Sequence, residues 1–269
     1  MAEDSARTVA DPITRLDTGV PHSARVWNYW LGGKDNFAAD RAVGDRVLEV
    51  YPDIAEIARA SRAFLARAIR YLAGEAGVRQ FLDIGTGLPT ADNTHEVAQR
   101  ITPAARIVYV DNDPLVLTHA RALLTSSDAG ATRYVDADMH DTTRILAEAA
   151  QTLDLTQPVA VMLLGILGYV PDYEQARSIV RGLMDAMPSG SFLVVNDGTE
   201  TSGSDQANRT ANQAGLPYNL RTREQFAGFF DGLELVEPGV ISSPRWRPDT
   251  GSIDDQPDMA VFCGVARKP

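Results

Sequence analysis

The sequence contains a single cysteine, Cys263, among its 269 residues. One cysteine cannot form an intrachain disulfide bond or a cysteine-based zinc site, and we predict no bound metal. Basic residues are also in deficit, because 25 Lys and Arg stand against 36 Asp and Glu and leave a formal net charge of −11. Since an acidic surface repels phosphate backbones, we expect no nucleic acid partner.

The sequence also lacks a long hydrophobic run. The longest, residues 159–167, is too short to cross a bilayer, and the polar N-terminal segment has no signal-peptide core. The overall composition, 44% hydrophobic and 23% charged, is typical of globular proteins and excludes collagen-like and wholly disordered chains. We therefore expect a cytoplasmic protein that does not associate with membranes.

The pattern of the chain changes twice along its length. Residues 1–22 combine charges with Pro and Gly and show little periodicity, which predicts a flexible arm. Residues 23–78 carry apolar positions at helical spacing and predict a helical cap or lid. From residue 79 to 269 the pattern alternates between strand and helix, and we expect one sheet-based domain there.

The C-terminal domain has the pattern of an α/β fold. Short apolar strands are expected at 80–84, 106–111, 132–138, 159–164 and 191–196, with helical segments between them. This alternation favours a doubly wound parallel sheet with right-handed crossovers. Two later strands, 233–236 and 259–265, have no helix between them and indicate an antiparallel pair. The polar segment 199–215 is either a mobile insertion or a solvated helix.

A glycine-rich turn follows the first of these strands. Asp83 ends the strand, and Gly85, Thr86 and Gly87 follow it. The two glycines allow a tight turn and a close approach of the backbone to a ligand. The third glycine of the dinucleotide-binding pattern is missing, because Thr90 stands there. The alternative interpretation is a plain connecting turn.

Acidic residues also end the next two strands. Asp111 is placed to accept both hydroxyls of a ribose, whereas Asp113 is better suited to capping the following helix. Asp138, followed by Met139, could accept from an adenine amine, with Met139 against the ring. Capping of the next helix is an equal alternative for Asp138.

These motifs together resemble the class I S-adenosylmethionine-dependent methyltransferases. The segments ARVWNYWLGGKDNFAADR, FLDIGTGLPTADNTHEVAQ and VYVDNDPLVLTHARALL, with the ending FCGVARKP, are similar to one bacterial family. That family is the S-adenosyl methyltransferase family, formerly a domain of unknown function, and the resemblance covers nearly the whole chain from residue 23.

The resemblance implies a Rossmann-like, seven-stranded sheet with an antiparallel last strand. It implies S-adenosylmethionine as cofactor and S-adenosylhomocysteine as product. Transferred residue by residue, it implies a cofactor site that includes Asp83, Gly85, Thr86, Gly87, Asn93, Asp111, Asn112, Asp138, Met139, Leu164 and Gly165. A lid over the cofactor would add Tyr29, Gly33 and Asn36, although a tight turn between two helices explains residues 32–36 equally well.

The sequence does not identify a catalytic residue. The segment after the fourth strand, residues 164–171, lacks the Asn/Asp-Pro-Pro-aromatic motif of many amine methyltransferases. Gly168 stands where the family commonly has a histidine, so a proton relay there is in doubt. Candidates for the acceptor side, each with packing or capping as the alternative role, are Tyr29, Tyr169, Asn196, Asp197 and Tyr218.

Three functions are compatible with these patterns. The first is methyl transfer from S-adenosylmethionine to a small-molecule acceptor. The second is a protein of methyltransferase fold that binds S-adenosylmethionine or S-adenosylhomocysteine without transferring a methyl group. The third, a nucleotide-dependent oxidoreductase, is disfavoured by Thr90 in place of the third glycine. The oligomeric state and the identity of the acceptor are left open.

Overall fold

The computed structural model describes residues 16–123, 126–200 and 204–269. Most of the predicted N-terminal arm, residues 1–15, lies outside the described residues. The helices are α1 (Ser23–Trp30), α2 (Ala38–Val50), α3 (Ile54–Arg70), α4 (Thr94–Ile101), α5 (Pro114–Leu123), α6 (Thr142–Ala149), α7 (Tyr173–Asp185), α8 (Ser204–Gln213) and α9 (Arg223–Ala227). The strands are β1 (Gln80–Ile84), β2 (Arg106–Asp111), β3 (Ala131–Asp136), β4 (Ala160–Leu164), β5 (Phe192–Gly198), β6 (Glu234–Leu235), β7 (Ile241–Ser242) and β8 (Val261–Arg267).

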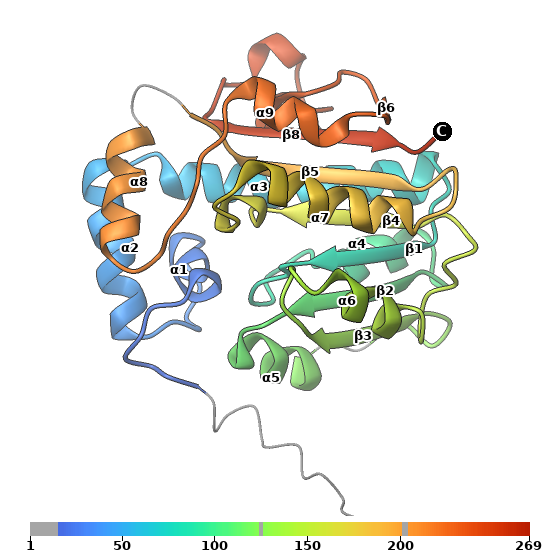
Figure 1. Ribbon diagram of the computed structural model, residues 1–269, viewed down its shortest axis with the longest axis horizontal. Helices are drawn as coiled ribbons and strands as arrows, with labels where there is room; N and C mark the ends of the chain where they lie inside the picture. Colours follow the sequence, from blue (N-terminus) through green and yellow to red (C-terminus); the bar gives the residue numbers. More distant parts are fainter. Residues whose placement is uncertain (1–15, 124–125, 201–203) are drawn as a thin grey trace, which may run out of the picture.

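One mixed sheet forms the centre of the molecule (Figure 1). Its strand order is β3-β2-β1-β4-β5-β8-β6, and the short strand β7 also pairs with β8. Strands β1 to β5 pair in parallel, whereas β8 runs antiparallel to β5, β6 and β7. The predicted doubly wound fold with an antiparallel last strand is confirmed, and β7 adds an eighth strand to the predicted seven.

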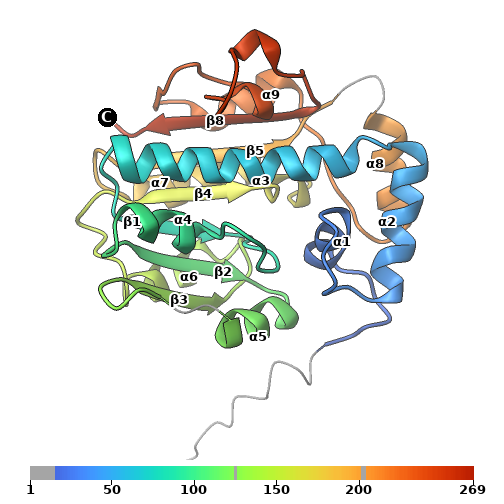
Figure 2. The same cartoon turned by 180° about the vertical axis from the view of Figure 1, so that it is seen from behind.

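Both faces of the sheet are covered by helices. Neighbouring residues of β1 point to opposite sides, because Phe81 packs with side chains of α3 and α4 while Leu82 packs with those of α6 and α7. Figure 2 shows α3 lying along one face. The sequences of the strands are therefore nearly continuous apolar runs, as expected for parallel strands that are buried on both faces.

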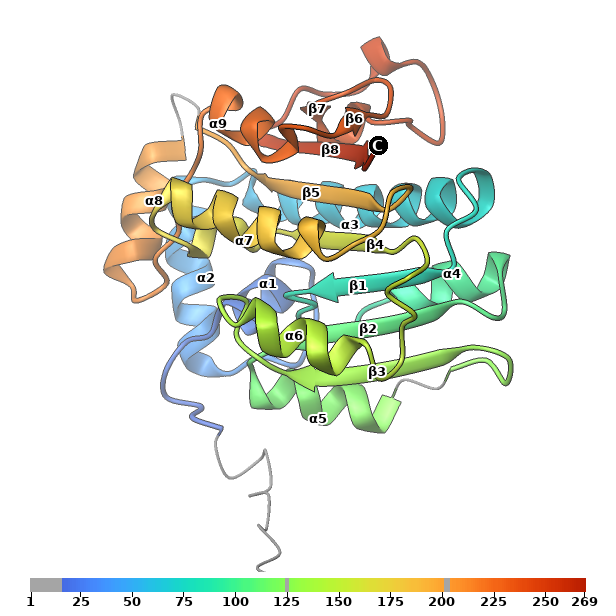
Figure 3. The same ribbon diagram turned by 45° about the vertical axis from the view of Figure 1, so that its right-hand side comes forward.

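Three helices stand at one end of the sheet instead of on its faces. The second of them, α2, packs against both α1 and α8, and Figure 3 shows all three beyond the carboxyl ends of the parallel strands. The polar segment 199–215 is thus largely a helix packed on α2. α3, which the sequence assigns to the cap, lies on the sheet, and the boundary at residue 78 stays a prediction.

The N-cap of α1 is His22, whose side chain accepts a hydrogen bond from the Ala24 amide. The last strand, expected at 259–265, lies further along the chain. The last strand spans Val261–Arg267 because its pairing with β5 extends to Phe192. None of the helices in the described residues is both long and apolar enough to cross a membrane.

The order of the strands places a crevice between β1 and β4. From β1 the chain continues outward through β2 and β3 on one side, whereas β4 and β5 extend the sheet on the other. In open α/β sheets, ligands bind outside the carboxyl ends of the strands at this reversal of strand order. A ligand site is therefore expected at the loops that follow β1, β2, β3 and β4.

Candidate functional site

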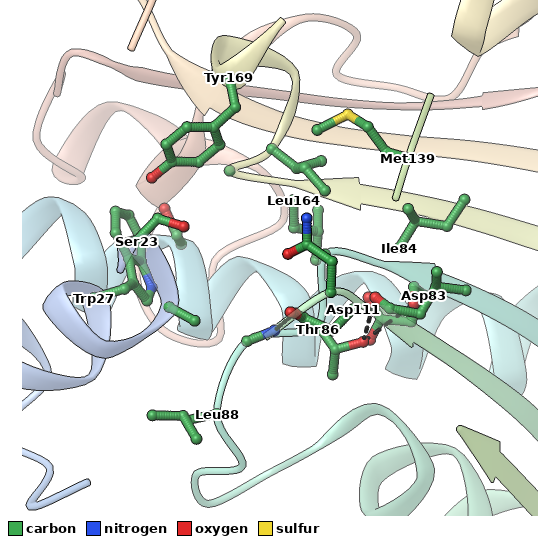
Figure 4. A pocket seen from close by; sticks show the side chains of 18 of the residues that line it. Ser23, Trp27, Asp83, Ile84, Thr86, Leu88, Asp111, Met139, Leu164 and Tyr169 are labelled. Atoms are coloured by element: carbon green, nitrogen blue, oxygen red, sulfur yellow. Dashed lines mark hydrogen bonds between the residues drawn. The ribbon is translucent and has the colours of Figure 1, made fainter. Parts of the chain in front are cut away.

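A cavity of about 320 Å³ lies at the carboxyl ends of these four strands (Figure 4). Helix α1 covers one side of it through Ser23 and Trp27, and α3 contributes Ser61 and Arg62. Ten residues predicted from the sequence line this cavity: Asp83, Gly85, Thr86, Gly87, Asp111, Asn112, Asp138, Met139, Leu164 and Gly165. The fold thus brings together loops that are far apart in the sequence.

The glycine loop after β1 needs its two glycines for different reasons. Gly85 has a φ of +74°, and a Cβ built on it would lie 2.1 Å from the Cδ1 atom of Ile166. Gly87 has a φ of +67°, and a Cβ there would meet no atom within 4 Å. Gly85 therefore lets two loops approach each other, while Gly87 leaves open space at the cavity wall.

Asp111 holds the glycine loop in place. Its Oδ2 accepts a hydrogen bond of 2.8 Å from the Gly87 amide, and its Oδ1 accepts one of 2.9 Å from the Asp113 amide. Burial raises the pKa of this carboxyl group, and the two amide hydrogen bonds act in the opposite direction. The side chain couples the end of β2 to the loop after β1.

Asp113 combines capping with a contact to the N-terminal helices. Its Oδ1 accepts a hydrogen bond from the Leu115 amide at the start of α5, and its Oδ2 lies 2.9 Å from the Nδ1 atom of His22. Burial opposes the charged form, but the interactions of Asp113 with His22, the Leu115 amide and Arg25 lower its pKa. Its hydrogen bond to Leu115 agrees with the capping role expected from the sequence.

Asp83 is a buried acid on the wall of the cavity. Its side chain accepts a hydrogen bond of 2.6 Å from the Thr94 hydroxyl, and the residue is 4% exposed. Burial raises its pKa to about 6, although the Thr94 hydrogen bond and the positive charge of Arg62 both lower it. Within the described residues, no cation forms a direct ion pair with Asp83, so a cationic ligand group would be favoured beside it.

A buried layer behind Asp83 supports this wall of the cavity. The Tyr109 hydroxyl accepts a hydrogen bond from the His95 amide and lies 2.8 Å from the Nδ1 atom of the same residue. Because the amide already donates to the oxygen, the hydroxyl proton is free to point at Nδ1. Burial lowers the pKa of His95, which favours this neutral ring. His95 is therefore a supporting residue and does not line the cavity.

The rim after β3 is polar and more open. Asp138 accepts a hydrogen bond of 2.9 Å from the His140 amide, and its Oδ1 lies 2.6 Å from the His140 Nδ1 atom. Asn112 donates a longer hydrogen bond to its other oxygen, 3.4 Å away. Burial raises the pKa of Asp138, but these hydrogen bonds outweigh burial and the pKa is lowered.

Four predicted residues do not line this cavity. Asn93 is the N-cap of α4 and exchanges hydrogen bonds with Thr90. The Tyr29 hydroxyl donates a hydrogen bond of 2.5 Å to Asp45 on α2.

Gly33 and Asn36 belong to the turn between α1 and α2, where both contact Asn28. Of these three residues, only Asn28 lines the cavity. The turn explains the glycines and polar residues of this segment without any ligand.

Some lining residues carried no signal in the sequence. Ser61, Arg62 and Leu65 all lie on one stretch of α3, whose helical pattern resembled an ordinary amphipathic helix. An arginine beside the buried stripe of such a helix is unremarkable in a sequence. Only the position of α3 across the sheet directs these side chains at the glycine loop.

Comparisons with a family model and with solved structures agree on the family of this chain. Residues 10–269 match the model of a family described as S-adenosyl methyltransferase. A DUF574 family protein from Streptomyces avermitilis MA-4680 is 45% identical, with 94% of this chain and 99% of that chain covered and a TM-score of 0.90. A candidate methyltransferase from Thermobifida fusca YX is 40% identical, with 94% and 96% covered and a TM-score of 0.87.

A more distant structure shows the fold alone. The magnesium protoporphyrin IX methyltransferase of Synechocystis PCC 6803, solved with bound S-adenosylhomocysteine, is 12% identical. The match covers 96% of this chain and all of that one, with a TM-score of 0.57. No curated protein sequence matches the chain. From the family match and the two similar structures, we conclude that the chain belongs to the S-adenosyl methyltransferase family, whose cofactor is S-adenosylmethionine.

Proposed function

We propose that this protein transfers the methyl group of S-adenosylmethionine to a small-molecule acceptor. The observation that carries the proposal is the cavity at the carboxyl ends of β1 to β4, with the buried carboxyl group of Asp83 on its wall. Its volume, about 320 Å³, lies in the range of pockets that hold cofactor-sized ligands.

Asp83 and the glycine loop suit the methionine part of the cofactor. A buried carboxylate without a direct cationic partner is costly, and an ammonium group beside it offsets that cost. Gly87 offers open space where a side chain would otherwise project. Arg62, the one Lys or Arg among the described lining residues, would attract the carboxylate of the methionine part.

Asp111 and the loop after β3 suit the nucleoside part. Asp111 is held rigidly by two backbone amides and retains lone pairs for the ribose hydroxyls. Met139 offers an apolar surface for the adenine ring, and Asp138 with Asn112 provides polar groups at its edge. Leu164 and Gly165 would form the floor beneath it.

The protein's contribution to the reaction would be position and exclusion of water. S-adenosylmethionine supplies an activated methyl group on a positively charged sulfur, so a good nucleophile needs little acid–base help. α1 closes one side of the cavity through Trp27, and the loop after β4 closes another through Ile166 and Tyr169. Holding the two reactants in line in such a site turns a bimolecular reaction into a step within one complex, which lowers the entropic part of the barrier.

Two measurements test the proposal. Calorimetry should show saturable binding of S-adenosylhomocysteine and none of NAD. Incubation with methyl-labelled S-adenosylmethionine and fractions of small-molecule extract should then label a low-mass product. Binding without any turnover would leave the protein as a cofactor-binding module, and failure to bind would refute the proposed site. The cytoplasmic location and the absence of a nucleic acid partner stay predictions.

A further inference from the structure

A second, smaller cavity adjoins the first. It has a volume of about 110 Å³ and lies between the end of β5 and the helices α1, α2 and α8. The two cavities share six lining residues: Ser23, Trp27, Ser61, Gly165, Tyr169 and Asn196. A molecule in the second cavity therefore borders directly on the proposed cofactor site.

The walls of this second cavity are mainly apolar. Helices α1 and α2 contribute Trp30, Val43 and Val47, and the segment after α8 contributes Leu216 and Leu220. No Lys, Arg or His belongs to its lining among the described residues. An anionic molecule would be buried there without a compensating charge, so carboxylates and phosphates are excluded as occupants.

Three oxygen atoms of the second cavity's lining residues are buried without a hydrogen-bond partner. They are Ser61 Oγ, Thr199 Oγ1 and Asn208 Oδ1. Thr199 is 1% exposed and Ser61 is 7% exposed. Buried polar atoms are normally paired, and leaving one unpaired costs about 1–3 kcal/mol. A ligand with hydrogen-bonding groups would satisfy them.

These oxygen atoms mark two separate positions. Ser61 lines both cavities and so lies at their junction, whereas Thr199 and Asn208 line only the second cavity. An occupant that reaches all of them needs polar groups at two places, joined by an apolar body. The volume limits that body to about one ring, because an apolar cavity of about 150 Å³, larger than this one, holds a single benzene.

One carboxyl group lines the second cavity among its described residues, that of Asp197. Its Oδ2 accepts a hydrogen bond of 3.0 Å from the amide of Gly168, and the next residue, Tyr169, lines both cavities. Burial raises its pKa to about 7, while the amides of Gly168 and Gly198 lower it. A carboxylate of this kind can accept a proton near neutral pH.

We infer that the second cavity binds the methyl acceptor, and that the acceptor is a small uncharged ring compound with hydroxyl groups at two positions. The inference rests on the proposed methyl transfer. The hydroxyl oxygen at the junction supplies the electron pair of the new C–O bond. The electron pair of the broken methyl–sulfur bond stays on sulfur, which becomes the neutral thioether of S-adenosylhomocysteine. The hydroxyl proton passes to the Asp197 carboxylate.

The first experiment measures binding to protein that is saturated with S-adenosylhomocysteine. Three matched probes share one ring and one hydroxyl and differ in the second group: resorcinol, m-cresol and 3-hydroxybenzoate. Calorimetry should rank resorcinol first. We expect m-cresol to bind about two- to tenfold more weakly, because one neutral hydrogen bond is lost. We expect no binding of 3-hydroxybenzoate at the same concentrations.

Two variants on α8 locate the probe. Ala211 lines the second cavity and does not line the first, so Ala211→Phe should abolish resorcinol binding and leave S-adenosylhomocysteine binding intact. Gln213, exposed on the same helix, gives the matched control, and Gln213→Phe should bind both ligands normally. Thr199→Val should reduce the preference for resorcinol over m-cresol.

The second experiment measures turnover with S-adenosylmethionine and resorcinol. Formation of the monomethyl ether with one S-adenosylhomocysteine per product supports the inference. Asp197→Asn should lower kcat by tenfold or more with little change in KM, and S-adenosylhomocysteine binding reports that this variant is folded. If S-adenosylhomocysteine binds but no probe does, the acceptor inference is wrong and the proposed methyl transfer survives. If S-adenosylhomocysteine itself fails to bind, the proposed function falls.

Discussion

At the scale of single residues, the cavity is defined by carboxyl groups in contrasting environments. Asp83 is buried with a hydroxyl partner, Asp111 is buried between two backbone amides, and Asp138 is exposed beside His140. The pKa is raised for the first two and lowered for the third. Each difference has consequences that binding experiments can measure.

Binding of S-adenosylhomocysteine should weaken as the pH falls through about 6. Asp83 has its pKa raised to about 6, so its carboxylate takes up a proton below that pH and loses its attraction for the ligand's ammonium group. One such proton reduces the affinity by up to about tenfold per pH unit. Calorimetry between pH 5 and 8 measures this slope.

The variant Asp83→Asn serves as the control for this pH dependence. It should bind S-adenosylhomocysteine weakly at every pH and lose the step near pH 6. Because the folded-state pKa of Asp83 is raised, ligand-free wild type gains stability from this group as the pH falls from about 6 toward 4. The variant should lack that gain. An unchanged step in Asp83→Asn would assign the titration to another group.

Replacement of Asp111 by Ala should reduce the affinity for S-adenosylhomocysteine by roughly 2–4 kcal/mol. The change removes a charged acceptor of hydrogen bonds and also frees the Gly87 amide that shapes the glycine loop. Asp128→Ala, at an exposed position outside the cavity lining, is the matched control and should bind normally. Wild-type affinity in Asp111→Ala would show that this carboxylate does not hold the ribose.

At the scale of elements, the turn between α1 and α2 is organised around one side chain. The Oδ1 atom of Asn28 accepts hydrogen bonds from the Asp35 amide and from the Asn36 side chain. A Cβ on Gly33 would lie 2.3 Å from the Nδ2 atom of the same Asn28. Since Asn28 lines the cavity, this turn influences the site without itself reaching it.

Adjacent glycines allow this element to be tested. Gly33→Ala should displace Asn28 and weaken S-adenosylhomocysteine binding. Gly32 has a φ of +79° with no atom within 4 Å of a built Cβ, so Gly32→Ala should cost about 1 kcal/mol of stability and leave affinity unchanged. Thermal melting and calorimetry on both variants separate the two effects. Equal affinities for both would show that the turn has no connection to the site.

At the scale of the whole molecule, a buried charge network fastens the N-terminal helices to the sheet. Arg25 on α1 lies 3.6 Å from carboxylate oxygens of both Asp40 on α2 and Asp113, which directly precedes α5. All three residues are at most 4% exposed. The network links α2 and the start of α5 to α1, the helix that covers one side of the cavity.

Removing the arginine should loosen this docking. Arg25→Ala leaves two buried carboxylates with less compensation, which costs about 3–5 kcal/mol when such a partner is lost. We expect faster hydrogen exchange in α1 and α2, with little change in β1 to β5, and weaker binding of S-adenosylhomocysteine. Arg46→Ala, on the exposed face of α2, should match wild type. Uniform acceleration across the sheet would instead indicate global unfolding.

Much of this architecture was determined locally by the sequence. Apolar strands alternate with helices at a fixed spacing, and this pattern predicts a doubly wound sheet whatever the later packing. Asp83 and Asp111 end predicted strands, and parallel strands present their carboxyl ends at one edge. Those two facts place Asp83, Asp111 and the glycine loop at one edge of the sheet, and the resemblance to the methyltransferase family supplied the other predicted residues that line the cavity.

The other cavity-lining residues depended on how elements that are far apart in the sequence pack against one another. Arg62 and Ser61 reach the first cavity only because α3 lies across the sheet, and Asn208 lines the second cavity with Thr199 only because α8 packs on α2. The spacing of apolar residues shows which face of a helix will be buried. It does not show which other element will pack against that face. Side-chain partners at sequence separations of a hundred residues or more are therefore decided by tertiary packing, whereas strand ends and glycine turns are decided within a few residues of the chain.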